Sequence, residues 1–394
     1  MTLMQKEIFE QPRALKECYD YNKETLEKLV AQLKASNVNN VIIAARGTSD
    51  HAGIYFKYLL ESKAGIPVGL SACSTATLYG GKINYKGMLV IGISQSGAAA
   101  DVNEVIKQAK ESGAVTVTVT NTLGSLLADA ADYHLYCDAG EEKSVAATKT
   151  FGTQLYILAN LACMWAGDED GLKALQTVPA YVEQVLTKND EIAELTKRYR
   201  FMNECFILSR GINYPLALEG TLKIQETNYV RAKGYPISDF HHGPFAMVDD
   251  GMPVFMYMPG GPVKEDAKKM IEKLHGAGAD LLMVSDDDEL LAEGTVSFKI
   301  PDSRGNDMIA AFGFATFAQL FASNLTNVKG RNPDAPRGLK KVTVTKQFQK
   351  REYNSNGKGS FRQAVSAHGS RCSRFSCVSG KRRCAGHSDK RGER

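Results

Sequence analysis

The feature that most constrains the fold of this chain is an apolar string that occurs twice, 164 residues apart. Met88 to Gly97 reads Met-Leu-Val-Ile-Gly-Ile-Ser-Gln-Ser-Gly, and Met252 to Gly261 reads Met-Pro-Val-Phe-Met-Tyr-Met-Pro-Gly-Gly. Both copies have an apolar run and a final glycine, but the two serines and the glutamine occur only in the first. A duplicated scaffold with polar groups at one strand exit predicts a ligand site at that exit.

The same offset recurs elsewhere in the chain. The sequence pattern of residues 41–47 recurs in residues 205–211, 164 positions later, and that of residues 113–119 recurs in residues 278–284, 165 positions later. Helix-like stretches such as 100–112 and 264–276, charged on one side and apolar on the other, separate these runs. Short apolar runs that alternate with helices are typical of βαβ units and parallel sheets. We therefore expect an α/β fold of two tandem, doubly wound subdomains, each a parallel sheet flanked by helices in three layers.

This pattern predicts five parts of the chain. They are an N-terminal helical segment (1–20), a first subdomain (21–190), a second subdomain (195–330), a C-terminal segment (331–345) and a basic tail (346–394). The charged stretch 188–197 is expected to be a helical connector.

Composition excludes several classes of protein. Of 394 residues, 43% are apolar and 23% are charged, as in ordinary globular enzymes. The formal net charge of +4 is misleading, because the tail holds 13 basic and 3 acidic residues and leaves 35 basic and 41 acidic residues in the first 345. The first 345 residues therefore lack the excess of basic residues that is typical of nucleic-acid-binding proteins. We expect neither a membrane span nor a secretory signal, and scattered cysteines favour reduced thiols in a cytoplasmic protein.

The tail has a composition unlike that of the body. It is rich in Ser, Arg, Lys and Gly, so we expect it to be disordered in isolation. A basic tail could bind nucleic acid or membrane phosphates, and Cys372, Cys377 and Cys384 with two histidines could suggest a metal site, but their spacing fits no standard zinc module. The preferred interpretation is read-through or frame-shifted sequence without a selected function.

Three turns in the first half carry hydroxyl groups. They are Ser94-Gln95-Ser96-Gly97, Arg46-Gly47-Thr48-Ser49 and the small-residue turn 144–150. Ligands of open parallel sheets bind at the carboxyl ends of strands, where helix N-termini and serine hydroxyls suit a phosphate. The alternative is that these turns only cap the helices that follow them. His51, just after the second turn, is by itself typical of a helix surface.

The second half carries different chemistry. Glu219, Lys223 and Glu226 fall on one face of a helix that begins near Tyr214. Their plain interpretation is an exposed ion-paired stripe; a carboxylate near the His241-His242-Gly243-Pro244 turn could instead form an acid/base pair with a histidine. Adjacent histidines without a third spaced ligand make a poor metal site, so we expect neither a metal nor a cofactor.

These motifs together resemble the sugar isomerase (SIS) family, and within it the isomerase half of glucosamine-6-phosphate synthase and its stand-alone relatives. The motifs that carry the resemblance appear in order: Gly47–Ser49, Ser94–Gly97, Val145–Lys149, Leu218–Glu226, His242–Pro244 and Pro336–Lys341. It extends from about residue 20 to Val344.

The resemblance implies a role for each matching residue. The binding residues for the sugar phosphate are Gly47, Thr48, Ser49, Ser94, Gln95, Ser96, Val145 and Ala147. Glu226 would move a proton between C1 and C2, with Lys223 beside it. His242 would open the sugar ring, in this family from the neighbouring subunit, which implies a homodimer with a shared active site. Lys341 would form a Schiff base with the open-chain ketose.

The chain departs from the synthase pattern. Ala98 and Ala99 replace a Glu-Thr pair, and Ala147 replaces a serine. The isomerase region begins within about twenty residues of Met1, so we expect no glutaminase domain.

Three functions remain open. The main expectation is deamination of glucosamine 6-phosphate to fructose 6-phosphate and ammonia. The second is another phosphosugar isomerase, an isomerase-type transaminase without a glutaminase domain, or a fructosamine-phosphate deglycase. The third is a non-catalytic sugar-phosphate sensor, although such sensors usually carry a DNA-binding helix-turn-helix.

Overall fold

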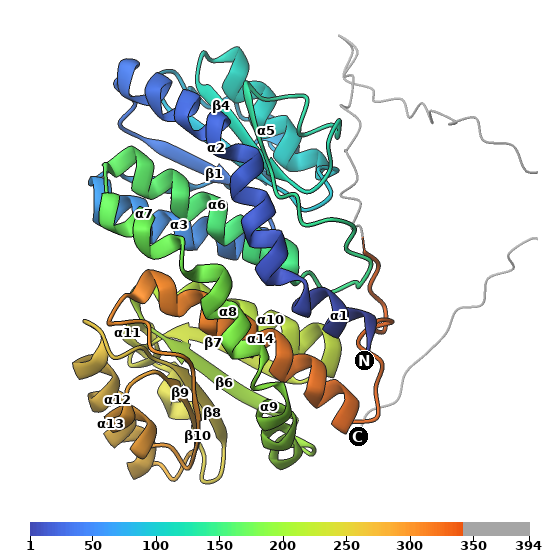
Figure 1. Ribbon diagram of the computed structural model, residues 1–394, viewed down its shortest axis with the longest axis vertical. Coiled ribbons are helices and arrows are strands. Elements are labelled where there is room, and N and C mark those ends of the chain that lie inside the picture. Colours follow the sequence, from blue (N-terminus) through green and yellow to red (C-terminus); the bar gives the residue numbers. More distant parts are fainter. Residues whose placement is uncertain (342–394) are drawn as a thin grey trace, which may run out of the picture. The chain divides into compact units, whose positions relative to one another are not determined.

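The computed structural model describes residues 1–341, and residues 342–394 are drawn as a grey trace in Figure 1. The end of the expected C-terminal segment, 342–345, and the whole tail, 346–394, with its cysteines, lie outside the described residues.

Residues 41–136 contribute a sheet of five parallel strands in the order β2-β1-β3-β4-β5. The strands are β1 (Val41–Ala44), β2 (Val68–Leu70), β3 (Leu89–Ile93), β4 (Val115–Thr120) and β5 (Tyr133–Tyr136). The chain runs from β1 through α3 (Thr48–Ala64) to β2 at one edge of the sheet, and from β3 through α5 (Ala100–Glu111) to β4 toward the other edge (Figure 1). The strand order therefore reverses between β1 and β3. Such a switch point is where open parallel sheets bind ligands.

The second half repeats this topology in the order β10-β9-β8-β6-β7, which is the same order when read from β7. Its parallel strands are β6 (Glu204–Ser209), β7 (Arg231–Pro236), β8 (Pro253–Tyr257), β9 (Asp280–Ser285) and β10 (Val296–Lys299). The two copies of the apolar string form β3 and β8, and the run that begins at Val41 and its partner form β1 and β6. The duplication expected from the 164-residue offset is therefore confirmed.

The helices agree with the expected pattern. They are α1 (Leu3–Phe9), α2 (Gln11–Ala35), α3 (Thr48–Ala64), α4 (Ser74–Thr77), α5 (Ala100–Glu111), α6 (Lys149–Ala166), α7 (Glu169–Leu175), α8 (Val178–Leu186), α9 (Asn189–Thr196), α10 (Tyr214–Asn228), α11 (Ile237–Phe240), α12 (Lys264–Gly276), α13 (Asp288–Ala292) and α14 (Asp307–Val328), with short 3₁₀ turns η1 (Lys197–Tyr199), η2 (Gly211–Asn213) and η3 (Pro244–Met247). The helix over 100–112 and the one over 264–276 are confirmed as α5 and α12.

One hydrophobic core joins the two sheets. Alternate residues of a strand face opposite sides, so Ile91 and Ile93 of β3 enter this shared core whereas Val90 enters a smaller core beneath α5. The shared core also takes Phe255 from β8 and Phe317 from α14. Helices α6 and α14 are buried along nearly their whole length, and they are largely apolar all round. The two subdomains are thus packed as one unit.

Helix α14 is long and apolar enough to cross a membrane by length and composition. Its most apolar window is, however, entirely buried inside the folded unit, and a core helix satisfies the same test. Its apolar character is explained by its place between the sheets.

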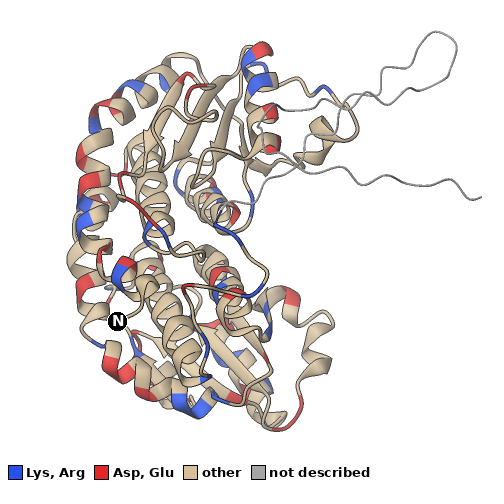
Figure 2. Cartoon of the chain, turned by 90° about the vertical axis from the view of Figure 1, so that its right-hand side faces the viewer, with Lys and Arg blue, Asp and Glu red and all other residues tan. Residues whose placement is uncertain are grey.

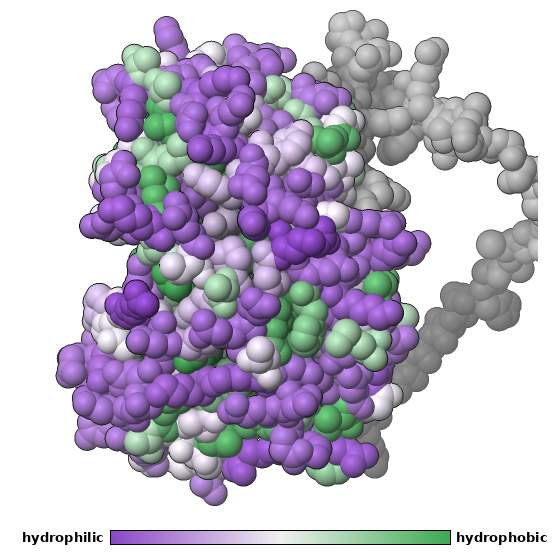
Figure 3. Space-filling model, in the orientation of Figure 1, coloured by the Kyte–Doolittle hydropathy of each residue, from purple (hydrophilic) through white to green (hydrophobic). Residues whose placement is uncertain are grey.

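The surface carries both charges. Lys and Arg alternate with Asp and Glu on the outer helices (Figure 2), and apolar side chains form only small groups on the face shown in Figure 3. Among residues 1–341 all cysteines are free thiols and buried, namely Cys18, Cys73, Cys137, Cys163 and Cys205.

Candidate functional site

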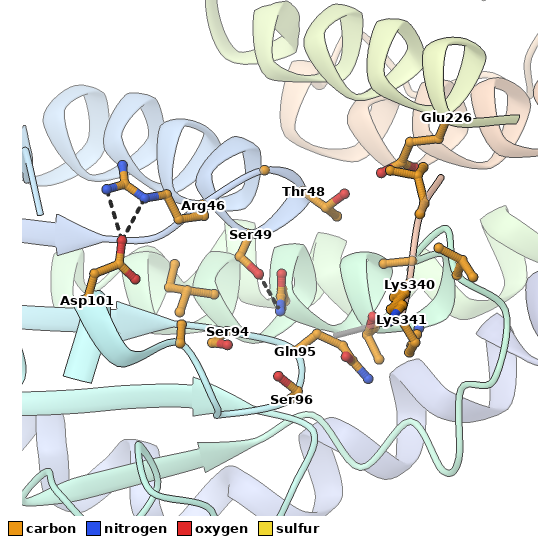
Figure 4. Close-up of a pocket in the computed structure, with 18 residues that line it drawn as sticks. Arg46, Thr48, Ser49, Ser94, Gln95, Ser96, Asp101, Glu226, Lys340 and Lys341 are labelled. Atoms are coloured by element: carbon orange, nitrogen blue, oxygen red, sulfur yellow. Dashed lines mark hydrogen bonds and ion pairs between the residues drawn. The ribbon is translucent and has the colours of Figure 1, made fainter. Parts of the chain in front are cut away.

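A cavity of about 420 Å³ opens at the switch point of the first sheet, beside the ends of β1 and β3. Ten of the residues singled out by the motifs line it: Gly47, Thr48, Ser49, Ser94, Gln95, Ser96, Val145, Ala147, Glu226 and Lys341. They come from the β1 and β3 exits, the 141–150 loop, α10 and the C-terminal segment. Figure 4 shows the serines in the middle and lower part of the cavity and Glu226 with Lys341 at one end.

Two glycines shape the hydroxyl-lined part of the cavity. Gly47, the residue before α3, has φ +54°, and Gly97 has φ +64°. A Cβ on Gly97 would lie 2.0 Å from Ser125 Oγ, so only glycine lets the chain turn so close to the next loop. Neither Ser94 nor Ser96 caps α5, because this helix begins after Ala99 with no side-chain cap. The capping alternative for this turn is therefore wrong, and the two serine side chains line the cavity instead.

Ser49 has a partner that the motifs did not indicate. Gln154 of α6, whose exposed fraction is 1%, donates a hydrogen bond from Nε2 to Ser49 Oγ at 3.2 Å. Because the Ser49 hydroxyl accepts this bond, its own proton is left to donate into the cavity. The Oε1 atom of Gln154 is buried without a hydrogen-bond partner.

Arg46 and Asp101 form the opposite end of the cavity (Figure 4). Arg46 Nε and Nη2 each lie 3.0 Å from Asp101 Oδ2. This pair ties the β1 exit to the first turn of α5. Sequence reasoning did not find it, because the two residues are 55 positions apart.

Glu219, Lys223 and Glu226 form part of a buried network rather than an exposed stripe. Lys223 Nζ lies 2.7 Å from Glu226 Oε2 and 3.3 Å from Glu219 Oε1, and both Lys223 and Glu219 have fully buried side chains. Burial alone would lower the pKa of Lys223, but the two carboxylates outweigh it and raise the pKa. Lys223 is therefore a charged ammonium group that holds Glu226 at the cavity wall. Lys223 itself lies behind the wall.

The network extends to the β1 exit. His51 Nδ1 lies 2.7 Å from Glu219 Oε2, and Thr48 Oγ1 lies 3.2 Å from both Glu219 Oε1 and Lys223 Nζ. Burial alone would raise the pKa of Glu219, but Lys223 and His51 lower it. His51 is thus not simply a helix-surface residue: its side chain is 13% exposed and pairs with a buried carboxylate. The first subdomain's hydroxyl turn and the second subdomain's acidic helix are joined directly.

Lys341 is paired with a carboxylate that the motifs did not indicate. Its Nζ lies 2.8 Å from Glu142 Oε2, and the Glu142 side chain is fully buried. Glu142 also accepts hydrogen bonds from the backbone N–H groups of Thr148 and Thr150 and from the Thr150 hydroxyl. Burial would raise the pKa of Glu142, but Lys341 and these donors lower it. Glu142 is therefore an ionised carboxylate inside the protein, and it holds the amine in place.

Helix α1 supports the loop that carries Glu142. The buried Glu7 carboxylate accepts hydrogen bonds from the backbone N–H groups of Lys143 (2.5 Å) and Ser144 (3.2 Å) and from the Ser144 hydroxyl. Glu10 pairs with the buried Lys149 at 2.6 Å. These contacts shape the turn that presents Val145 and Ala147 to the cavity.

His242 is the predicted site residue that the structure leaves outside the cavity. It follows α11 in an exposed turn of the second subdomain, where its backbone N–H bonds to Asp239 O at 3.0 Å. Within one copy of the chain it does not join Glu226 and Lys341.

The tandem parallel sheets, with a cavity at the switch point of the first, define an α/β protein of the doubly wound class. The family model for the SIS domain matches this chain twice, at residues 34–164 and 202–328. The chain belongs to the SIS domain family.

Relatives of known name are similar over most of this chain. A glutamine–fructose-6-phosphate aminotransferase (isomerizing) from Thermococcus kodakarensis is 36% identical over 352 residues, which are 86% of this chain and 58% of the relative. This chain therefore spans a little over half the length of that relative.

Solved structures are similar in fold. The C-terminal domain of glucosamine-fructose-6-phosphate aminotransferase from Francisella tularensis superposes with a TM-score of 0.76 at 28% identity, covering 85% of this chain and 98% of that domain. A glucosamine-6-phosphate deaminase from Thermotoga maritima has a TM-score of 0.69 at 22% identity, covering 87% of this chain and all of that one. At this identity the second likeness speaks for the fold alone.

Proposed function

We propose that this protein interconverts an amino-sugar 6-phosphate and a ketose 6-phosphate, and that its reaction is deamination of glucosamine 6-phosphate to fructose 6-phosphate. The observation that carries the proposal is the composition of one cavity. Its hydroxyl groups suit a phosphate, and Glu226 and Lys341 at its end supply a carboxylate and an amine.

Hydroxyl and backbone donors, with no lysine among them, are assigned to bind the phosphate. Thr48 and Ser49 stand at the first turn of α3, where the helix dipole favours an anion. Ser94, Gln95 and Ser96 add donors from the β3 exit. Arg46 lines the cavity too, but its charge is paired with Asp101.

The proton transfer is assigned to Glu226. In the open-chain amino sugar, Glu226 removes the C2 proton and returns it to C1, while a second proton passes from the C2 nitrogen to the C1 oxygen. The aldehyde and amine thereby become a C1 alcohol and a C2 ketimine. Lys223, 2.7 Å away, orients the carboxylate and balances its charge.

Release of ammonia is assigned to Lys341. Its amine adds to C2, ammonia leaves with the nitrogen that C2 carried, and a Schiff base to Lys341 remains. Water then hydrolyses the Schiff base to fructose 6-phosphate and restores the amine. The balance is one amino sugar phosphate and one water for one ketose phosphate and one ammonia.

Ring opening is assigned to His242 of a second copy of this chain. His242 is exposed and lies outside the cavity of its own copy, so a homodimer with a shared site would bring it to Glu226 and Lys341.

The second candidate is the aminotransferase direction, with a nitrogen donor and fructose 6-phosphate as substrates. It is favoured by the 36% identity to the Thermococcus kodakarensis relative, whose name gives that activity. The same groups would act in reverse order.

The deciding experiment is incubation of the full chain with millimolar glucosamine 6-phosphate while ammonia and fructose 6-phosphate are measured. Equal release of both supports deamination. Formation of glucosamine 6-phosphate only from fructose 6-phosphate with ammonia or glutamine supports the second candidate. Binding without turnover of any of these overturns both and leaves a sugar-phosphate sensor.

A further inference from the structure

Tyr229 closes α10 in a conformation that tyrosine rarely adopts. Its φ is +55° and its ψ +31°, in the left-handed region. Bulky residues avoid this region, and glycine or asparagine ordinarily occupies the position that ends a helix in this way. Residues held in such conformations are usually fixed by their surroundings. The contacts of the side chain explain why a tyrosine stands here.

The Tyr229 ring is held by the C-terminal segment. The guanidinium carbons of Arg331 and Arg337 each lie over the ring, 4.7 Å from its centroid. The backbone N–H of Arg337 donates a hydrogen bond to the Tyr229 hydroxyl at 2.6 Å. One side chain thus makes three contacts with the residues that lead to Lys341.

These contacts lie between the two groups assigned to the chemistry. Glu226 is three residues before Tyr229 on the last turn of α10, and Lys341 is four residues after Arg337. The segment has other attachments besides Tyr229, including a hydrogen bond from the backbone N–H of Arg331 to Thr326 O at 2.9 Å. Asp334 accepts the backbone N–H groups of Leu3 and Met4 at 2.8 Å, and Lys341 pairs with Glu142. Tyr229 is the attachment that joins the segment to the helix of Glu226.

We propose that Tyr229 is a positioning residue that sets the place of the Lys341 amine relative to the Glu226 carboxylate. The inference rests on the proposed function, since the Schiff base to Lys341 is what the positioning would serve. Tyr229 itself does not line the cavity, so it acts through the segment and not on the substrate.

The test compares Tyr229→Asn, Tyr229→Phe and the wild type. Asparagine tolerates the left-handed conformation, so Tyr229→Asn removes the ring without forcing the backbone to change. Tyr229→Phe keeps the ring and removes only the acceptor for Arg337. Tyr79→Phe is the matched control, because Tyr79 is 82% exposed.

The first readout is borohydride trapping of fructose 6-phosphate on Lys341, located by peptide mass. We expect Tyr229→Asn to slow trapping at least ten-fold and Tyr229→Phe about three-fold. We expect kcat to fall in parallel while KM changes less than two-fold and the melting temperature stays within a few degrees. Trapping by Tyr229→Asn at the wild-type rate would overturn the inference.

The second readout is hydrogen exchange of residues 331–341, which needs no turnover. We expect faster exchange in Tyr229→Asn than in the wild type and no change in Tyr79→Phe. If the wild type traps no sugar but exchange still rises, the proposed function fails while the anchoring by Tyr229 stands. Unchanged hydrogen exchange in Tyr229→Asn would show that Tyr229 does not anchor the segment, and it would overturn the inference.

Discussion

Lys341 and Glu142 are separated by 199 residues in the chain, and their side chains meet at 2.8 Å in the wall of the cavity. The Glu142 carboxylate is fully buried and accepts three further hydrogen bonds, from Thr148 and from Thr150 in the first turn of α6. A buried carboxylate with these partners stays ionised, so Glu142 holds the side chain of Lys341 in place. Schiff-base formation would therefore require the Lys341 amine to leave Glu142.

This pair predicts a pH dependence of stability. Because the pKa of Glu142 in the folded protein lies below its ordinary value of 4.5, the pair stabilises the fold above that pH and loses this contribution as pH falls further. We expect Glu142→Gln to lower the free energy of unfolding by about 2 kcal/mol at pH 7. Urea unfolding between pH 3 and pH 8 measures it. A difference from wild type that does not shrink below about pH 4.5 would contradict the assignment.

Glu226→Gln tests the proton transfer. We expect kcat to fall about 10²–10⁴-fold, since an amide cannot accept the proton, while the dissociation constant for the sugar phosphate changes less than about three-fold. Steady-state kinetics and titration calorimetry measure the two effects. Glu24→Gln, at a side chain that is 86% exposed, is the control and should behave as wild type. Full activity in Glu226→Gln would remove this residue from the proton-transfer role.

Gln154→Leu tests whether the hydrogen bond from Gln154 to Ser49 helps Ser49 bind the sugar phosphate. Loss of the hydrogen bond to Ser49 Oγ should raise KM for a sugar phosphate by about five- to ten-fold, the equivalent of one hydrogen bond, with a smaller change in kcat. The exposed Gln176→Leu is the matched control. Inhibition constants for inorganic phosphate and for the unphosphorylated sugar show which end of the ligand Gln154 affects. An effect on the sugar alone would place Gln154 away from the phosphate.

Lys223→Met tests the buried network. It leaves Glu219 and Glu226 without their shared cation, and we expect it to cost roughly 3–5 kcal/mol of stability. In the double variant with Glu219→Gln the cost should be clearly less than the sum of the single changes, because one buried charge is removed with its partner. Denaturant unfolding of the four proteins in this cycle gives the coupling free energy. Additive effects would mean that the pair is not coupled.

Mixed dimers test the place of His242. Neither His242→Ala nor Glu226→Gln should be active alone. In the proposed homodimer, refolding the two variants together would make half of the dimers mixed, and each mixed dimer would hold one complete site. Activity should therefore return to about a quarter of the wild-type value. Each variant refolded alone is the control. No recovery in the mixture would mean that His242 does not act across a subunit interface.

Much of the fold is predictable from local pattern. Strands β3 and β8 follow from the two apolar strings, and the start of α10 follows from Tyr214-Pro215. These features depend on residues near one another in the chain, where side-chain period and helix-starting residues act directly. The position of the hydroxyl turns at the cavity is also predictable, because the carboxyl ends of parallel strands lie at one edge of a sheet.

The sequence by itself determined the duplication, the two parallel sheets and the hydroxyl groups at the strand exits, whereas the strand order with its switch point came from the structure. Only the tertiary structure decided that Glu219 and Lys223 are buried, that His51 pairs with Glu219 and that Glu142 holds Lys341. Each of these contacts joins segments that meet only when the two subdomains and the C-terminal segment pack together. A charged side chain in a local pattern is equally suited to a solvated face, and it is burial against a distant partner that makes it part of a site.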